Sequence, residues 1–298
     1  MTRHALIGGG TGFVGTRLVN HLTSQGYDVT VVSRMPGLKR ITWHQLEKDG
    51  IPKGVTSVVN LAGQNVLDPS RRWTAGFKQN VWNSRVNSAS SLVKAIEKSG
   101  GVDAFVNISG VSHYPANDNK VYTENDKVEG FDFMSRLCLE WEKAATLPDN
   151  STARGIKLRT GVVVGREGGM IQSIWMPFNL GLGGPMGTGK QILPWIHLED
   201  LCRLIQHCLE SKNCRGVLNA VAPDIVTNGE FSKIFASALR RPCLFPVPEF
   251  VVDLMFGKDR SALLLNGAKI EPKRTLETGF NFKYPTAKVA CQEVVQKK

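Results

Sequence analysis

The sequence lacks any run of about 18 consecutive apolar residues, the length that a membrane-spanning helix requires. It also lacks a Cys-x-x-Cys pair, and its six cysteines stand singly along the chain. Three of them recur every six residues, a spacing that matches no metal-ligand pattern. We therefore predict free thiols in a reducing compartment, no metal centre and no membrane contact. The cysteines are Cys138, Cys202, Cys208, Cys214, Cys243 and Cys291.

Acidic residues are fewer than basic ones, with 26 Asp+Glu against 37 Lys+Arg in 298 residues and a formal net charge of +11. The basic residues are dispersed along the chain, so we do not expect a nucleic-acid partner. A basic balance also suits an enzyme with anionic ligands. The content of 42% hydrophobic and 21% charged residues is typical of a globular protein, in one large domain or two closely joined ones.

The N-terminal residues Met1-Thr2-Arg3 run directly into an apolar strand pattern, which leaves no room for a presequence. We therefore expect a cytoplasmic protein. The mitochondrial matrix stays open as an alternative, because a basic chain would fit there if its N-terminus had been trimmed.

A glycine-rich loop follows the first predicted strand, His4–Ile7, and precedes apolar residues at helical spacing. A second strand follows, so strand, loop, helix and strand fit within 33 residues, the size of a βαβ unit. In that context a Gly-x-Gly-x-x-Gly pattern predicts a dinucleotide site, because glycines let the backbone approach a pyrophosphate and the first helical N–H groups bind it. The expected contacts are Gly9, Gly10, Thr11, Gly12, Phe13, Val14 and Gly15.

The end of the second strand indicates which dinucleotide binds. An NAD site usually has Asp or Glu there, whereas a nearby Arg accommodates the 2′-phosphate of NADP. This chain has Ser33-Arg34 and no carboxylate. Arg34 could form paired hydrogen bonds with the phosphate and Ser33 could donate to it, so we predict NADP.

Alternating strands and helices predict an α/β fold, a Rossmann-type doubly wound parallel sheet. Ligands bind beyond the carboxyl ends of such strands, so the later strand ends should face the cofactor as well. Helices are predicted over residues 77–98 and 131–145, and Asn80 and Arg85 on the first are polar candidates for the cofactor side. The strand-end candidates are Leu61, Ala62 and Gly63, then Ser109 and Gly110, then Val163.

Several motifs resemble the extended short-chain dehydrogenase/reductase superfamily, namely Gly9-x-x-Gly12-Phe13-x-Gly15, Asn60-Leu61-Ala62-Gly63 and Trp195-Ile196-His197-x-x-Asp200. A more specific set is similar to the atypical family 39U, known as epimerase family proteins and regarded as NADP-dependent oxidoreductases. That set comprises Arg72-Trp73, Ser84-Arg85, Gly181-Leu182-Gly183-Gly184-Pro185 and Pro194-Trp195-Ile196-His197.

The resemblance implies a Rossmann domain and a smaller C-terminal substrate domain that closes over the nicotinamide. We expect the first to span residues 1–165 with 195–222 returning to it, and the second to span 166–194 and 223–298. The resemblance also implies that Ser33 and Arg34 bind the 2′-phosphate, that Leu61 and Ala62 lie along the cofactor, and that a homodimer could form. It adds Asn80, Arg85 and Val163 as contacts.

Typical members of the superfamily carry Tyr and Lys four residues apart on one helix, and a Ser at the preceding strand end. The Lys lowers the pKa of the Tyr, which exchanges a proton while a hydride moves to or from the nicotinamide. That pair is absent from the corresponding helix here. Alignment puts Asp132 at the Tyr position and Arg136 at the Lys position, although the two could equally form a surface pair.

The Ser position falls at or beside Gly110, with Ser109 as a neighbour, and Tyr114 and His113 are alternative proton donors. The catalytic candidates are therefore Ser109, Tyr114 and Asp132. Two functions stay open. One is an NADP-dependent oxidoreductase or epimerase-like enzyme on an unidentified small substrate, which a second domain would enclose. The other is a non-catalytic NADP(H)-binding sensor or partner-binding protein, which the missing Tyr/Lys pair favours.

Overall fold

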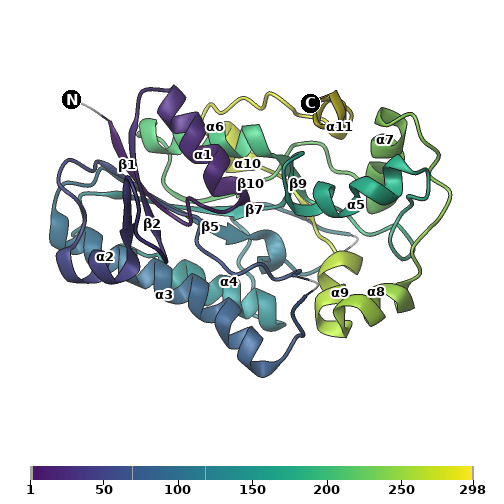
Figure 1. Ribbon diagram of the computed structural model, residues 1–298, viewed down its shortest axis with the longest axis horizontal. Coiled ribbons are helices and arrows are strands. Elements are labelled where there is room, and N and C mark those ends of the chain that lie inside the picture. Colours follow the sequence, from purple (N-terminus) through teal and green to yellow (C-terminus); the bar gives the residue numbers. More distant parts are fainter. Residues whose placement is uncertain (1–2, 69, 118, 297–298) are drawn as a thin grey trace.

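A seven-stranded sheet forms the centre of the computed structural model, which describes residues 3–68, 70–117 and 119–296. All its strand pairs are parallel, and their order is β10-β7-β5-β4-β1-β2-β3 (Figure 1). This arrangement confirms the predicted doubly wound α/β fold. The strands are β1 (His4–Gly8), β2 (Asp28–Ser33), β3 (Arg40–Thr42), β4 (Ser57–Asn60), β5 (Ala104–Gly110), β7 (Arg154–Thr160) and β10 (Gly216–Ala220).

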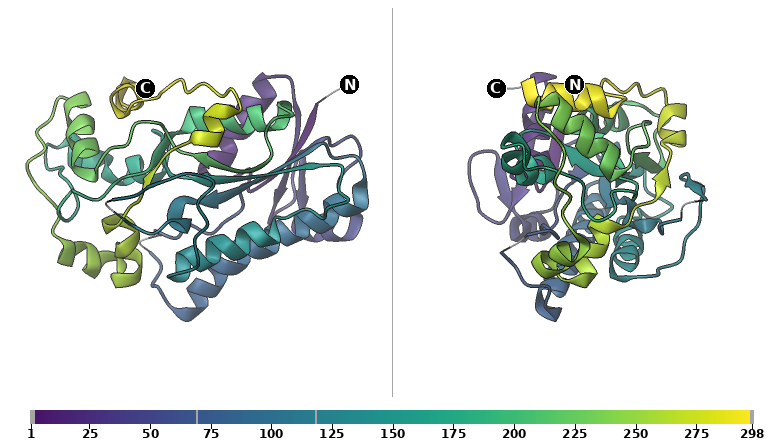
Figure 2. Two further views of the ribbon diagram at one scale, coloured as in Figure 1. Left: turned by 180° about the vertical axis from the view of Figure 1, so that it is seen from behind. Right: turned by 90° about the vertical axis from the view of Figure 1, so that its right-hand side faces the viewer.

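Helices cover both faces of the sheet. One face packs against α1 (Phe13–Ser24) and α6 (Leu198–Glu210), and the other against α2 (Trp43–Asp49), α3 (Ala75–Ser99) and α4 (Phe133–Ala144) (Figure 2). Successive side chains of a strand point to opposite faces. Within β1, therefore, Ala5 and Ile7 join one apolar cluster and Leu6 joins the other. Burial on both faces explains why these strands read as continuous apolar runs.

A group of elements outside the sheet comes from residues 111–122, from residues 162–197 and from the C-terminal third. The segment from 165 to 194 contains helix α5 (Gly169–Asn179). That helix shares a cluster with α7 (Asn228–Ala238) and α11 (Ala287–Gln296) (Figure 1). The other elements are η1 (Val111–His113), β6 (Val121–Tyr122), β8 (Val162–Val164), β9 (Trp195–His197), α8 (Glu249–Phe256), α9 (Lys258–Leu265), β11 (Lys269–Ile270) and α10 (Lys273–Glu277).

The outer edge of β10 is covered by side chains in place of a further strand. The backbone N–H of Asn219 donates to Glu124 Oε1 over 2.9 Å, and its carbonyl accepts from Thr275 Oγ1 over 2.8 Å. Both covering side chains are buried. Their positions satisfy backbone groups that an edge strand otherwise leaves open.

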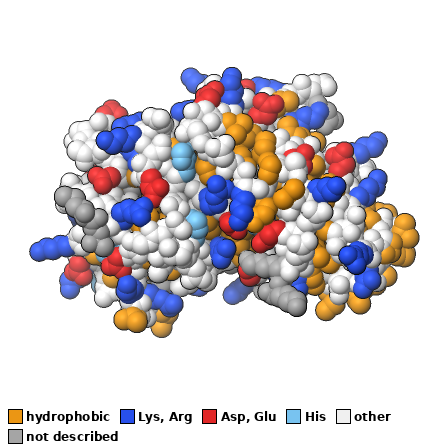
Figure 3. Space-filling view, turned by 90° about the horizontal axis from the view of Figure 1, so that it is seen from above, with side chains coloured by type: hydrophobic (Ala, Val, Ile, Leu, Met, Phe, Trp, Pro, Cys, Tyr) orange, Lys and Arg blue, Asp and Glu red, His pale blue; other side chains and the backbone are white. Residues whose placement is uncertain are grey.

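The surface shows no segregation of charge on the face drawn in Figure 3, where basic side chains are interspersed with acidic and neutral ones. Among the helices of the described residues, none is long and apolar enough to cross a membrane. The six cysteines are all unpaired, and five of them are buried.

Candidate cofactor and active site

The glycine loop between β1 and α1 has backbone geometry that only glycine fits. Gly9 lies in the left-handed region at φ +78°, and a Cβ there would be 2.8 Å from the Ala62 amide nitrogen. A Cβ at Gly15 would collide with the Gly9 carbonyl, and one at Gly10 would lie 2.7 Å from Val31 Cγ2. The loop is therefore pressed onto β2, onto the end of β4 and onto itself.

The outer side of this loop is open. Gly12 is exposed, and a Cβ there would find only the Gly9 carbonyl oxygen, at 3.5 Å. Gly12 is also the N-cap of α1, where no side chain caps the helix and no acidic residue stands in the first turn. The first N–H groups of α1 are thus available to an anion, which the helix dipole favours. This loop fits a pyrophosphate, and exposed Thr11 lies beside it.

The end of β2 is basic. Arg34 is exposed and forms no hydrogen bond or ion pair with any residue that the structure describes. Arg40 opens the neighbouring strand β3 and is also exposed, and its guanidinium likewise forms no hydrogen bond or ion pair within the described ranges. The Ser33 hydroxyl donates to the Met35 carbonyl, so it is already engaged. Free guanidinium groups of this kind suit a phosphate monoester. Arg40 could not be identified from the sequence, because it comes near β2 only through the β2–β3 pairing, which places it opposite Val31.

The end of β4 is fixed by a buried amide ladder and carries Arg85 beside it. Asn60 donates to Asn107 Oδ1 over 2.7 Å and accepts from the Ala62 N–H. The Arg85 guanidinium is so close to Gly63 that a Cβ there would lie 3.1 Å from its Cζ. Arg85 donates one hydrogen bond, to the Val81 carbonyl, and has no carboxylate partner among the described residues. Burial lowers its pKa to about 10, which leaves it charged at neutral pH.

Phe13 joins the glycine loop to the segment after β8. A Cβ at Gly168 would lie 2.5 Å from Phe13 Cδ2, and one at Gly169 would lie 3.2 Å from Phe13 Cε1 and 3.4 Å from the Val163 carbonyl. Val14 and Val163 are partly buried against the same apolar cluster. The structure therefore brings the loop and Val163 together. Asn80 is exposed on α3, with no contact that ties it to these residues.

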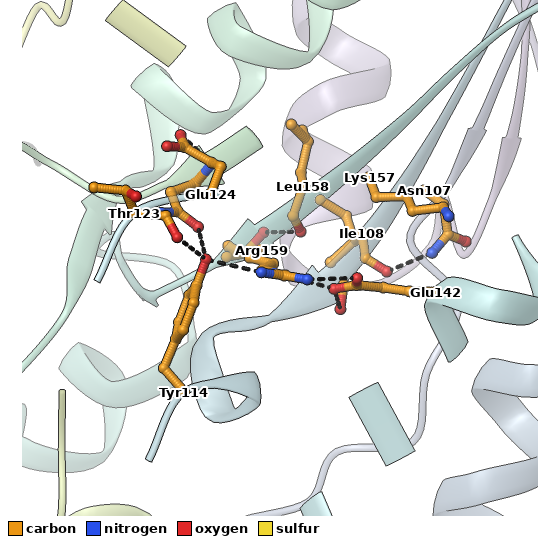
Figure 4. A network of polar contacts seen from close by, with 12 residues as sticks. Asn107, Ile108, Tyr114, Thr123, Glu124, Glu142, Lys157, Leu158 and Arg159 are labelled. Carbon is orange, nitrogen blue, oxygen red and sulfur yellow. Dashed lines mark hydrogen bonds and ion pairs between the residues drawn. The ribbon is translucent and has the colours of Figure 1, made fainter. Parts of the chain in front are cut away.

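The end of β5 leads into a buried polar network (Figure 4). Ser109 donates to Glu142 Oε1 over 2.9 Å, and Arg159 binds both oxygens of that carboxylate over 2.8 Å each. Arg159 also donates to the Tyr114 hydroxyl over 2.8 Å, and this hydroxyl in turn donates to Asn219 Oδ1. The network ties α4 to the sheet.

Electrostatics in the network follow from burial and pairing. Burial alone would raise the pKa of Glu142, but the hydrogen bonds and charge of Arg159 outweigh it and lower that pKa below its ordinary value. Burial raises the pKa of Tyr114, against the opposing effect of Arg159. Glu142 is therefore ionised and Tyr114 is protonated at neutral pH.

Two of the catalytic candidates have structural roles in this fold. Tyr114 is 4% exposed, and its hydroxyl is occupied by hydrogen bonds within the network. Asp132 is the N-cap of α4, where its side chain accepts from the Ser135 N–H over 2.7 Å. Arg136 is exposed and donates to the Asp132 backbone carbonyl. Because α4 begins at Phe133, Asp132 precedes the helix and its carboxylate is engaged as the cap.

The face of α4 that meets the end of β5 carries Cys138 and Glu142. A Cβ at Gly110 would lie 3.4 Å from Cys138 Sγ, and Ser109 bonds Glu142. Burial raises the pKa of Cys138 to about 12, and the charge of Glu142 acts in the same direction. The thiol is therefore neutral and cannot supply the positive charge of the usual Lys.

Beyond β5 lies His113, buried in η1. Neither of its ring nitrogens has a hydrogen-bond partner among the described residues. No group of three or more His, Cys, Asp and Glu residues able to hold a metal ion was found in those ranges.

Comparisons with known proteins agree with this geometry. Residues 5–220 match the NAD dependent epimerase/dehydratase family, and residues 247–294 match a domain of unknown function. The human epimerase family protein SDR39U1 is 45% identical over 291 residues, which cover 97% of this chain and 99% of that protein. These matches confirm the resemblance that the motifs indicated.

Solved structures give the same result. The crystal structure of human epimerase family protein SDR39U1 (isoform 2) with NADPH superposes with a TM-score of 0.97 at 43% identity, covering 99% of this chain and 100% of that one. A nucleoside-diphosphate sugar epimerase from Corynebacterium glutamicum has a TM-score of 0.78 at 23% identity, covering 99% of this chain and 58% of that one, and so shares the fold.

Proposed function

The chain belongs to the NAD dependent epimerase/dehydratase family, and on that premise we propose that it is an NADP-dependent oxidoreductase with an epimerase-like site for a small substrate. One observation carries the choice of cofactor. Arg34 is exposed and without a partner in the described structure, at the end of a strand that offers no carboxylate to a ribose hydroxyl. The NADPH in the structure of the human relative supports the same choice.

The residues that would hold NADP(H) are the open glycine loop, Arg34 with Arg40, and Arg85 at the end of β4. The loop and the first turn of α1 bind the pyrophosphate, and the two arginines bind the 2′-phosphate. When bound, the nicotinamide supplies or accepts a hydride. Phe13, at the start of α1, packs against Gly168 and Gly169 in the segment that follows β8.

A calorimetric titration with NADPH and NADH tests the cofactor. We expect the wild-type chain to prefer NADPH by tenfold or more, about 1.4 kcal/mol. Arg34→Ala should remove that preference, because the affinity for NADPH should fall while the affinity for NADH should stay unchanged. Lys39→Gln is the matched control, since Lys39 lies in the same segment but is paired with Asp28 over 2.7 Å. Equal affinity of the wild type for the two cofactors would refute the proposal.

A non-catalytic NADP(H) sensor is the second candidate, and the α4 face supports it. That face presents a neutral Cys138, and no Lys, to the end of β5 at Gly110. Loss of NADPH absorbance across a panel of carbonyl compounds separates the two functions. Steady-state turnover with any compound excludes the sensor, whereas tight NADPH binding with no turnover and a cofactor-dependent change in partner binding favours it.

A further inference from the structure

His113 is the polar side chain that the fold leaves least satisfied. It lies in η1, directly after the carboxyl end of β5, and is 3% exposed. Both Nδ1 and Nε2 are shielded from solvent and have no hydrogen-bond partner in the described structure. By contrast, His197 is equally buried, but its Nε2 pairs with Glu293 over 2.9 Å and its Nδ1 accepts from the Glu199 N–H.

An unpartnered buried nitrogen destabilises a fold, since a lost hydrogen bond costs about 1–3 kcal/mol for each group. Two such nitrogens on one ring therefore call for an explanation, and a ligand that completes their hydrogen bonds is one. An apolar side chain of similar size would fill this space without that penalty.

His113 is surrounded by elements that meet at the end of β5. η1 packs against α4, the helix that carries the proton-transfer pair in typical members of the superfamily. The ring meets Tyr114 edge to face, with centroids 5.0 Å apart. Burial lowers the pKa of His113 to about 4, the charge of Arg159 acts in the same direction, and Glu142 opposes them. At neutral pH the ring is thus uncharged, with one N–H to donate and one nitrogen to accept.

We propose that His113 is a catalytic residue whose imidazole meets the nicotinamide end of the site and donates a hydrogen bond to the reacting oxygen of the substrate, a carbonyl or a secondary hydroxyl. This inference rests on the proposed NADP-dependent function. A neutral imidazole can polarise a carbonyl through this hydrogen bond. The proton that the product oxygen gains, or that a secondary hydroxyl loses, is then exchanged with water, so the step does not need the Tyr/Lys pair as its proton donor. The ring nitrogens are covered in this structure, so the ligand must displace what covers them.

Nuclear magnetic resonance of ¹⁵N-histidine-labelled wild-type chain tests this placement. Ring nitrogen shifts are followed during titration with NADPH and, separately, with adenosine 2′,5′-bisphosphate, which fills the adenosine end and has no nicotinamide. We expect NADPH to move the His113 signals, the bisphosphate to leave them in place, and His197 to stay unchanged in both. His113→Gln identifies the signals.

Each result has a definite meaning. If NADPH binds but the His113 signals stay fixed, or if the bisphosphate moves them equally, this inference is overturned and the proposed function stands. If NADPH does not bind, both are overturned. Urea unfolding supplies a readout independent of the cofactor, because His113→Leu should not lower the unfolding midpoint whereas His197→Leu should. Equal losses would mean that His113 has structural partners, and would also overturn the inference.

Discussion

The buried pair of Glu142 and Arg159 allows a quantitative test of how α4 is held on the sheet. The side chains are 9% and 7% exposed, and two hydrogen bonds of 2.8 Å join them. Glu142→Leu leaves a buried guanidinium without its counter-charge, which costs about 3–5 kcal/mol. The Ser109 hydroxyl loses its acceptor as well, at about 1 kcal/mol. We therefore expect the free energy of unfolding to fall by about 4–6 kcal/mol.

The double variant Glu142→Leu/Arg159→Met separates the charge effect from packing. Replacing both partners with apolar side chains removes the uncompensated charge and is often neutral. Ser109 and Tyr114 each still lose a partner, so we expect the double variant to lie within about 2 kcal/mol of the wild type. Urea unfolding followed by tryptophan fluorescence measures all three proteins. A double variant at least as unstable as Glu142→Leu would refute this reasoning.

The same pair predicts a loss of stability in acid. The pKa of Glu142 is lower in the folded chain than its ordinary value of 4.5, so the unfolded chain binds the proton more readily. The pair's contribution is therefore fully present well above pH 4.5 and is lost as pH falls below that value. Unfolding midpoints measured from pH 7 to pH 3 should show this loss in the wild type and a smaller one in the double variant.

Three further substitutions test other parts of the site. Gly9→Ala should abolish NADPH binding in calorimetry and destabilise the fold by about 1–3 kcal/mol, because φ is +78° and the new Cβ meets Ala62; unchanged affinity would contradict the loop geometry. Asp132→Ala should cost about 1 kcal/mol in urea unfolding through loss of the cap, with turnover unchanged; a tenfold loss of turnover at full cofactor binding would restore it as a catalytic candidate. His113→Gln should flatten the stability profile in acid, since burial lowers the pKa of His113 from 6.5 to about 4 and the wild type loses stability as pH falls through that range; an unchanged profile would contradict the burial argument.

The glycine loop could be predicted from the sequence because its determinants are local. Glycine alone tolerates the conformation at Gly9 and the close contact at Gly15, and both stand within a short βαβ unit. Arg34 could be predicted for a similar reason, because it directly follows the last residue of β2. The structure puts these residues where the sequence pattern indicated.

The α4 region could not be predicted in the same way. Helical periodicity shows that a helix forms but does not say which face meets the sheet, so Cys138 and Glu142 were not singled out. Glu142 and Arg159 become partners only when α4 and β7 are packed together. Asp132 did carry a local signal, because Asp three residues before a Ser at the start of a helix is typical of an N-cap.

The covered edge of β10 bears on how copies of the chain can associate. An open sheet edge invites a strand from another molecule, which leads to sheet extension or aggregation. Here Glu124 and Thr275 already hold the outward N–H and C=O of Asn219, so an eighth strand finds no partner at that point. At the opposite edge, β3 has only three residues and begins with the exposed Arg40. Continuing the central sheet into a second copy is therefore blocked beside Asn219 and limited to three residues at β3.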